Sequence, residues 1–313
     1  MTIETGQLVE SPISGSACVR AEGFEVERIV SAYREAVGLD VADYFAGREL
    51  IWLFTCPDTG YRFFAPDSLA GGRELYSALQ DFPWYYKLRR EHLQAKQWVK
   101  AGSTLLEVGC GRGTFLNAVK DRVTGEGIES NVDAVAFARS EYGLDVSARA
   151  IEEMVAAGKT YDYVAAFEVL EHVCTPRDFV QSMAKLLKPN GRLLLSVPNC
   201  NPYSLRFDRY DPLNLPPHHM GYWDVGALKR FAAWCGLRVE RVWVEPLGGI
   251  ARRYVAFQIA HYEALKRPSP NDARRLRFFR WAAGSERRLR LCARLWAGRT
   301  ILIRLRRTGG GLD

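Results

Sequence analysis

The sequence lacks long apolar runs and contains little cysteine or histidine. No stretch of roughly 18 consecutive apolar residues occurs, so no membrane-spanning helix is expected. The opening MTIETGQLVE has neither a basic start nor an apolar segment, so no secretory signal peptide is predicted. The 7 cysteines are scattered and odd in number, which favours free thiols over a disulfide framework. We therefore expect a cytoplasmic protein.

The apolar content of the chain indicates how many domains it can form, and its charge distribution sets residues 251–313 apart from the rest. Of the 313 residues, 48% are hydrophobic, which allows one large domain with additions or two modest ones. Residues 251–313 contain 16 Arg and Lys against 4 Asp and Glu, whereas the rest of the chain is net acidic. A basic segment of this kind could face anionic lipid or nucleic acid.

Strand-like and helix-like segments alternate from about residue 90 to 245. Strands are predicted at residues 104–108, 123–130, 161–170, 192–197 and 237–244. Helices are predicted at residues 131–142 with Gly143 as a stop, after Thr175-Pro176 as far as residues 189–191, and after Asp224 as a cap. This alternation predicts an α/β fold with a doubly wound, mostly parallel, Rossmann-like sheet. Ligands of such sheets bind beyond the carboxyl ends of the strands.

The two ends of the chain are expected to add to this sheet. Residues 251–298 are typical of helices, interrupted by Pro268 and Pro270, and residues 298–307 alternate as one more strand. We therefore predict an N-terminal extension over residues 1–90 and a cofactor-binding domain over residues 91–245. Residues 246–313 would form a basic helical insertion and a last strand.

The segment EVGCGRGT at residues 107–114 follows a predicted strand and opens a predicted helix. Gly109, Gly111 and Gly113 let the backbone turn tightly and approach a ligand closely. A dinucleotide fingerprint needs glycine at the position of Thr114, so a nicotinamide oxidoreductase is disfavoured. At the end of the second strand, the Glu129 carboxylate could accept hydrogen bonds from both ribose hydroxyls of a nucleoside.

Four segments resemble successive motifs of the class I S-adenosylmethionine-dependent methyltransferases: LLEVGCGRGTFL, GIES, FEVLEHV and LLKPNGRLLLSVPN. The resemblance covers about residues 100–245 and implies a seven-stranded sheet with S-adenosyl-L-methionine as the cofactor. It implies that the methionine and ribose parts are lined by Gly109, Cys110, Gly111 and Gly113, with Glu107 near the methionine amine and Glu129 and Ser130 at the ribose hydroxyls.

The same resemblance assigns residues to the adenine and to the sulfonium. Ala150, Ile151 and Glu152 would flank the adenine. In the family pattern a strand ends just before these residues, and DVSARAIEEM at residues 145–154 departs from that pattern because it lacks the Asp often found there. Phe167, Glu168 and His172, at the end of the predicted strand 161–170, would lie close to the sulfonium.

A longer resemblance concerns a subgroup common in bacterial surface-glycan gene sets. It is carried by VGLDVADYFAG, LFTCPDTGYRFFAP, DFPWYYKL and PPHHMGYW. Some relatives begin with a zinc ribbon, CxxCG…CxxCG, whereas the corresponding knuckles here read SPISG at residues 11–15 and CPDTG at residues 56–60. One thiol cannot hold tetrahedral zinc, so a persisting ribbon is expected to be metal-free and no metal ion is predicted.

The segment between the predicted strand at residues 192–197 and the next helix contains LPPHHMGYW at residues 215–223. A loop of this length is usually functional or disordered, and its prolines and aromatic residues favour an ordered wall of the acceptor pocket. His218 or His219 is the first candidate for a catalytic base and His172 the second; alternatively, the histidines only hydrogen-bond the loop to itself. Tyr85 and Tyr86 could form a lid over the cofactor or an aromatic core cluster.

These features together predict an S-adenosylmethionine-dependent methyltransferase that O-methylates a sugar, a glycan or another small polar metabolite. The alternatives are an RNA methyltransferase that uses the basic segment and a non-catalytic S-adenosylmethionine-binding protein. No known RNA-binding module is recognisable, so nucleic acid is not the expected partner. The segment RRLRFFRWAAGSERRLRLCARLWAGR could lie on the inner face of an anionic membrane, or its apolar side chains could pack on the core.

Overall fold

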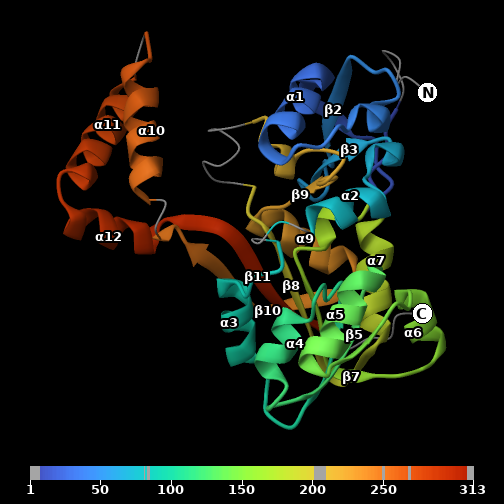
Figure 1. Ribbon diagram of the computed structural model, residues 1–313. Coiled ribbons are helices and arrows are strands. Elements are labelled where there is room, and N and C mark those ends of the chain that lie inside the picture. Colours follow the sequence, from blue (N-terminus) through green and yellow to red (C-terminus); the bar gives the residue numbers. More distant parts are fainter. Residues whose placement is uncertain are drawn as a thin grey trace.

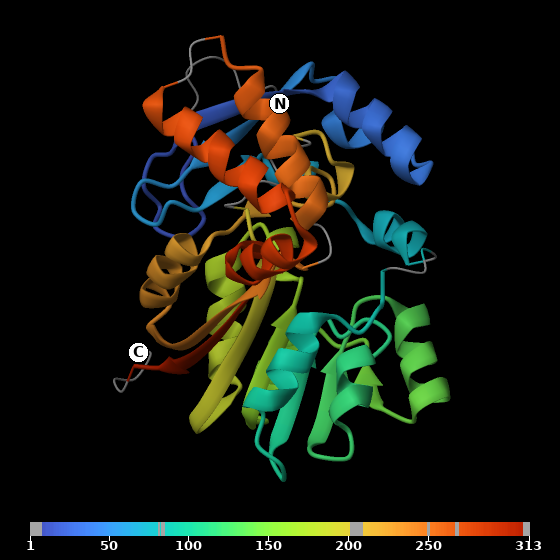
Figure 2. The ribbon, with the colours of Figure 1, turned by 90° about the vertical axis from the view of Figure 1, so that its left-hand side faces the viewer.

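The computed structural model of the protein contains two β-sheets and a projecting group of helices (Figure 1). It describes residues 8–80, 82, 85–200, 209–248, 251–266 and 269–308. Both Figure 1 and Figure 2 show the N-terminal unit at one end of the central sheet. Among the described residues, no helix is both long and apolar enough to cross a bilayer.

The central sheet has seven strands in the order β10-β11-β8-β7-β4-β5-β6. Their bounds are β4 Thr104–Val108, β5 Thr124–Ile128, β6 Asp145–Ser147, β7 Tyr161–Phe167, β8 Leu187–Pro198, β10 Leu237–Pro246 and β11 Ala297–Arg307. Strands β4 to β8 pair in parallel, and β11 runs antiparallel to both of its neighbours. The predicted seven-stranded, mostly parallel sheet is therefore confirmed.

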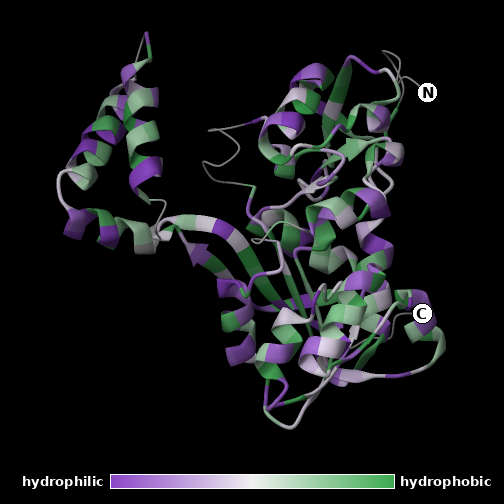
Figure 3. Ribbon diagram, in the orientation of Figure 1, coloured by the Kyte–Doolittle hydropathy of each residue, from purple (hydrophilic) through white to green (hydrophobic). Residues whose placement is uncertain are grey.

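Helices cover both faces of this sheet, as a doubly wound fold requires. The helices are α3 Arg90–Trp98, α4 Thr114–Val119, α5 Val132–Tyr142, α6 Ile151–Ala156, α7 Pro176–Lys185 and α9 Val225–Trp234. Successive strand residues point to opposite faces, so Leu105 packs with α3, α4 and α5, whereas Leu106 packs with α6, α7 and α9. Both faces are buried, and Figure 3 shows the strands correspondingly rich in hydrophobic residues.

Two predicted helix starts are confirmed by their caps. The Asn131 side chain accepts hydrogen bonds from the backbone N–H groups of the first turn of α5, and Gly143 ends that helix at φ 65°. Asp224 accepts a hydrogen bond of 2.7 Å from the N–H of Ala227 at the start of α9.

The predicted end of α7 was wrong. The helix ends at Lys185, and Leu187 already belongs to β8 instead of to the helix. The Tyr161 N–H donates to the Leu186 carbonyl at 2.8 Å, which begins the pairing of β7 with β8. Because Leu186 and Leu187 are buried in the same core in either conformation, the apolar pattern could not show where the helix gives way to the strand.

The N-terminal unit is a four-stranded antiparallel sheet with its own core. Its elements are β1 Val19–Glu25, α1 Val26–Val37, β2 Leu50–Thr55, β3 Arg62–Ala65 and α2 Arg73–Leu79, with short 3-10 helices at Ala42–Phe45 and Asp67–Leu69. The fourth strand, β9 Gly221–Tyr222, comes from the PPHHMGYW segment and pairs with β3. Among its described residues, the segment between β8 and α9 contains only this two-residue strand and the 3-10 helix Pro212–Asn214 as regular structure; residues 201–208 of the same segment lie outside the described residues.

The two ribbon-like knuckles face each other in the N-terminal unit. Gly15 and Gly60 have φ values of 74° and 70°, and each N–H donates at 2.9 Å to the carbonyl four residues earlier. The Ser14 Oγ lies 3.6 Å from the Cys56 Sγ. Burial raises the pKa of Cys56, but hydrogen bonds with Ser11, Thr59 and Ser14 outweigh this effect and hold it below its usual value. The four positions that bind zinc in a complete ribbon thus converge around the Cys56 thiol, and the Cys18 thiol, which hydrogen-bonds with Ser11, lies nearby.

Three helices, α10 Ala251–Glu263, α11 Pro270–Ala283 and α12 Glu286–Leu295, connect β10 to β11. They project away from the central sheet (Figure 1) and have a small core of their own that includes Val255, Phe279 and Leu289. Pro270 is the first residue of α11, where proline is favoured, and Pro268 lies outside the described residues. The predicted helical insertion and last strand are both confirmed.

Candidate active site

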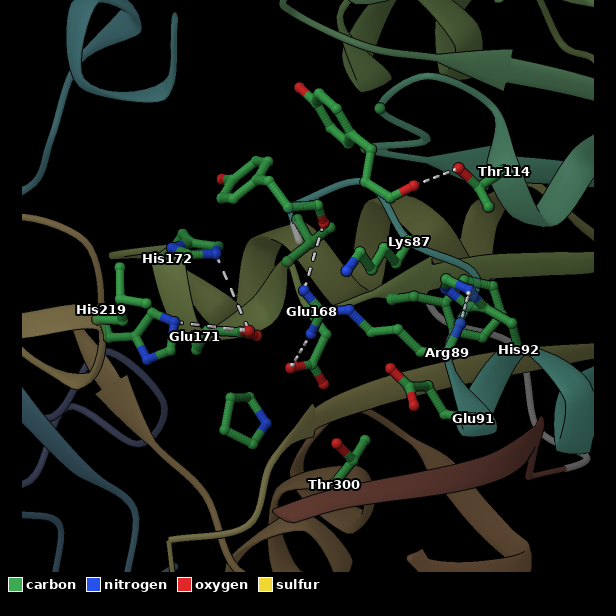
Figure 4. A pocket seen from close by; sticks show the side chains of 18 of the residues that line it. Lys87, Arg89, Glu91, His92, Thr114, Glu168, Glu171, His172, His219 and Thr300 are labelled. Carbon is green, nitrogen blue, oxygen red and sulfur yellow. Dashed lines mark hydrogen bonds and ion pairs between the residues drawn. The ribbon is translucent and has the colours of Figure 1, made fainter. Parts of the chain in front are cut away.

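A cavity of about 950 Å³ lies at the carboxyl ends of β4, β7 and β8. Its walls come from the glycine turn after β4, from residues 85–92, from the segment after β7 and from the PPHH turn (Figure 4). This is the edge of a doubly wound sheet at which ligands are expected to bind.

The glycine turn has the conformation that its sequence predicts. Gly109, Gly111 and Gly113 have φ values of 70°, 53° and 72°, which side-chain-bearing residues rarely adopt. A Cβ atom on Gly111 would lie 2.5 Å from the ring of Tyr86. Tyr86 therefore covers this part of the turn, and its carbonyl accepts a hydrogen bond of 2.9 Å from the Thr114 hydroxyl.

Two carboxylates flank the turn, as predicted. Glu107 is 3% exposed, its Oε2 atom has no hydrogen-bond partner, and burial raises its pKa well above the usual range. Glu129 accepts hydrogen bonds from the N–H groups of Gly111 at 2.8 Å and Asn131 at 2.9 Å. A buried carboxylate with one unpartnered oxygen, beside close-approach glycines, fits the methionine amine of S-adenosylmethionine, and Glu129 fits a hydroxyl-bearing ribose.

The other cofactor residues predicted from the sequence divide into two groups. Cys110, Ser130, Phe167 and Glu168 line the cavity together with Glu107, Gly109, Gly111 and Glu129. Gly113, Ala150 and Ile151 do not line it. Gly113 caps α4, Ala150 is exposed, and Ile151 packs in the core of the sheet.

Glu168 adopts a backbone conformation that is rare for a residue with a side chain, with φ 53°. Its carboxylate lies 3.5 Å from the Arg89 guanidinium and accepts a hydrogen bond of 3.4 Å from the Ser196 hydroxyl. Burial, followed by the neighbouring Glu91, raises the pKa of Glu168. The sequence prediction missed Arg89 and Glu91, because they lie before the first motif strand and match no family motif.

The three histidines predicted as catalytic lie together at one end of the cavity. The ring centroids of His172, His218 and His219 are between 4.5 and 4.9 Å apart. Burial lowers the pKa of His172 to about 4 and that of His218 to about 3, and it lowers the pKa of His219 well below its usual value. The imidazoles are therefore neutral at pH 7.

The histidines make hydrogen bonds to the loop as well as facing the cavity. The His218 Nδ1 lies 2.9 Å from the Leu213 carbonyl, and the His172 Nδ1 lies 2.5 Å from the His218 carbonyl. The sequence prediction missed Glu171, whose Oε1 atom lies 3.9 Å from the Nε2 atoms of both His172 and His219. The available signal was a Glu-His pair directly after a buried strand.

Comparisons with known proteins agree with this geometry. Residues 80–242, just over half of the chain, match the family described as "Methyltransferase domain". The ubiquinone biosynthesis O-methyltransferase of Caulobacter vibrioides is 36% identical over 105 residues, which are 31% of this chain and 42% of that protein. The chain thus spans less than half the length of this curated relative. This relative is named for ubiquinone biosynthesis, so membership of this chain in the surface-glycan subgroup stays a prediction.

Two solved structures are also similar to the chain. A SAM-dependent methyltransferase from Archaeoglobus fulgidus has a TM-score of 0.46 and 20% identity, covering 75% of this chain and 94% of its own. A SAM-dependent methyltransferase from Geobacter sulfurreducens, solved with S-adenosyl-L-homocysteine, has a TM-score of 0.45 and 14% identity, covering 77% and 100%. The domain match, considered with the sheet order and the cavity at the glycine turn, assigns the chain to the methyltransferase domain family as a class I S-adenosylmethionine-dependent methyltransferase.

Proposed function

We propose that the protein transfers the methyl group of S-adenosylmethionine to a hydroxyl oxygen of a small polar acceptor. The observation that carries this proposal is that one continuous cavity connects the glycine turn with the histidine cluster. A cavity of about 950 Å³ is at the upper end of the size of small-molecule sites and has room for two ligands side by side. Holding the acceptor oxygen and the methyl group in line could supply about 7–11 kcal/mol of the barrier.

The donor is assigned to the glycine-turn end of the cavity. Glu107 would bind the methionine amine, Glu129 the ribose hydroxyls, and Phe167 and Glu168 would lie near the sulfonium. The roles of Ala150 and Ile151 at the adenine remain predictions from the family resemblance.

The acceptor is assigned to the end that holds His172, His218 and His219. A neutral imidazole can accept a hydrogen bond from the acceptor hydroxyl, and such a group is a candidate for taking its proton. A sugar or glycan hydroxyl is the acceptor that the sequence predicts. The curated relative named an O-methyltransferase of ubiquinone biosynthesis supports oxygen as the methylated atom and makes a phenolic hydroxyl the second candidate.

The first experiment is a calorimetric titration with S-adenosylhomocysteine. Glu129→Ala should weaken binding by about five- to 150-fold, since two hydrogen bonds to the ribose contribute about 0.5–1.5 kcal/mol each. Glu126→Ala, which removes a carboxylate that pairs with Lys159 instead, is the matched control and should bind as the wild type does. The double variant His218→Ala/His219→Ala should also retain binding, because the histidines belong to the acceptor end.

The acceptor is then sought with a donor labelled in its methyl group. Nucleotide sugars, glycan fragments and polyhydroxylated phenols should be tested separately, followed by total RNA. Labelling of a hydroxyl in a small molecule is the expected result. Labelling of RNA alone would favour the RNA methyltransferase alternative, and failure of the wild type to bind S-adenosylhomocysteine would contradict the proposed function altogether.

We also propose that helices α10 to α12 contact an anionic membrane surface. Phe278, Trp281 and Leu291 are 43%, 46% and 57% exposed, and exposed arginines including Arg274 and Arg277 surround them in sequence. Exposed aromatic and aliphatic side chains beside arginines suit the interface of an anionic bilayer.

This proposal is tested by sedimentation with vesicles of phosphatidylglycerol and phosphatidylcholine. Trp281→Ser should reduce binding several-fold. Trp234→Ser is the matched control, because that tryptophan is 41% exposed but lies on α9, and it should have no effect. Equal binding to pure phosphatidylcholine, or equal effects of the two variants, would contradict the proposal.

A further inference from the structure

The cavity ends in a buried cluster of four side chains that can all bind a metal ion. Glu171 and His172 belong to the 3-10 helix Leu170–His172, and His218 and His219 belong to the turn before β9. The ligand atoms of the three histidines all lie within 4.8 Å of one another. The Glu171 carboxylate lies between His172 and His219, as Figure 4 shows.

Several polar atoms of this cluster are buried without a partner. Glu171 is 1% exposed, and neither of its carboxylate oxygens has a hydrogen-bond partner. His218 is 6% exposed, and its Nε2 atom also has none. Leaving such an atom unsatisfied is unfavourable, and a buried unsatisfied group in a folded protein is often explained by an ion or a water molecule.

The hydrogen bonds of His172 and His218 determine which of their ring nitrogens keeps a lone pair. The Nδ1 atoms of His172 and His218 each contact a backbone carbonyl, at 2.5 and 2.9 Å. A carbonyl oxygen can only accept, so both Nδ1 atoms must carry the proton, and both Nε2 atoms must carry a lone pair. Metal-binding histidines usually have this arrangement, in which the distal N–H is bonded to a carbonyl or carboxylate.

We propose that His172, His218 and His219, together with Glu171, bind one divalent transition-metal ion such as Zn²⁺ or Fe²⁺. Imidazole and carboxylate ligands suit these ions. Zinc–nitrogen bonds of about 2.0–2.1 Å place tetrahedral ligand atoms roughly 3.3 Å apart, so the widest separations in the cluster need to shorten by about 1.5 Å. The proposal departs from the expectation of no metal, which rested on the ribbon alone.

The role of the ion rests on the proposed function. Since the cluster faces the acceptor end of the cavity, the ion would take the acceptor hydroxyl as a fifth ligand and lower its pKa, so that the proton leaves to solvent. The oxygen then forms a bond to the methyl carbon while the carbon–sulfur bond breaks, and the sulfur keeps the electron pair as S-adenosylhomocysteine. Because the Nε2 lone pairs of His172 and His218 would bind the ion, these imidazoles would hold the ion instead of taking the proton themselves.

The test is a titration of the chelator-treated full chain with Zn²⁺ by calorimetry and with Co²⁺ by visible absorption. We expect one ion per chain, with an affinity in the micromolar range or tighter and a cobalt spectrum typical of nitrogen and oxygen ligands. His219→Gln and Glu171→Gln should each weaken binding at least tenfold. His261→Gln, an exposed histidine on α10, and Cys56→Ser, which removes the ribbon thiol, should not.

Binding of S-adenosylhomocysteine is measured on every variant, so that a folding defect is not mistaken for a lost ligand. The proposal would be overturned if the wild type binds no ion. It would also be overturned if the His219→Gln and Glu171→Gln variants bind the ion as tightly as the wild type does. If the ion binds but no hydroxyl is methylated, the proposed function fails while the metal site stands. If methyl transfer is equally fast with and without the ion, the site stands and its role in the reaction fails.

Discussion

Replacing the three hydroxyl side chains of the ribbon knuckles by thiols should turn this part of the protein into a zinc site. The variant carries Ser11→Cys, Ser14→Cys and Thr59→Cys, and Cys56 is the fourth ligand. Zinc–sulfur bonds of about 2.3 Å place tetrahedral sulfurs roughly 3.8 Å apart. The Ser14 Oγ already lies 3.6 Å from the Cys56 Sγ, so the knuckles need little movement.

The expected size of the effect follows from the contacts that are exchanged. Without zinc, each substitution should lower the free energy of unfolding by about 1 kcal/mol, because a hydroxyl hydrogen bond is lost. When the free zinc concentration is about 1,000-fold above the Kd, binding to the folded state should raise the free energy of unfolding by about 4.1 kcal/mol. At about 2 °C per kcal/mol, the melting temperature of the variant should rise by about 8 °C when zinc is added.

The assay combines elemental analysis with thermal unfolding in the presence and absence of a chelator. Each protein also carries His219→Gln, so that zinc at the histidine cluster does not contribute. The control is the same variant with Cys56→Ser added. Zinc should raise the melting temperature of this control much less than that of the four-thiol variant. A four-thiol variant that contains no zinc, or one that is equally stabilised without Cys56, would refute the inferred convergence of the knuckles.

Two further predictions concern the central sheet. Leu302→Ala, which empties a fully buried position on β11, should lower the free energy of unfolding in urea by about 2–5 kcal/mol, and a loss below about 1 kcal/mol would contradict the inclusion of β11 in the core. Asp162 accepts hydrogen bonds at 2.8 Å from Lys188 and Thr104, and these contacts lower its pKa to about 2. Its folded pKa lies below its unfolded value, so its stabilisation is present above about pH 4 and disappears as the pH falls towards 2. Asp162→Asn should therefore lower the free energy of unfolding by about 1 kcal/mol at pH 7, allowing for solvent screening of this half-exposed group. If the difference in stability from the wild type does not shrink at low pH, this account is contradicted.

The sheet could be predicted from the sequence because its signals are local. Asn131, Gly143 and Asp224 act at helix ends through bonds to residues at most five positions away. The glycine turn is equally local, since its conformation depends on residues that tolerate positive φ. The position of the glycine turn at one end of the cavity was predicted for the same reason, together with the family motifs.

The histidine end of the cavity was harder to predict because its contacts are distant in sequence. His172 and His218 are 46 positions apart, and no periodicity links a 3-10 turn after β7 to a turn before β9. The strand β9 has two residues and forms only because β3 offers it a partner. Glu171 could be seen as a carboxylate, but its burial beside two histidines depends on how the N-terminal unit closes over the sheet.

The position of β11 also has a consequence for the order in which the protein is assembled. Strands β8 and β10 do not pair with each other, because β11 lies between them. When the ribosome has released β10, the strand that must join it to the sheet begins 50 residues later, at Ala297. Until then β8 has an open edge and β10 has no sheet partner, a state in which nascent chains are prone to associate. Helices α10 to α12, which are synthesised during this interval and have their own core, would shorten the distance that β11 must search to complete the sheet.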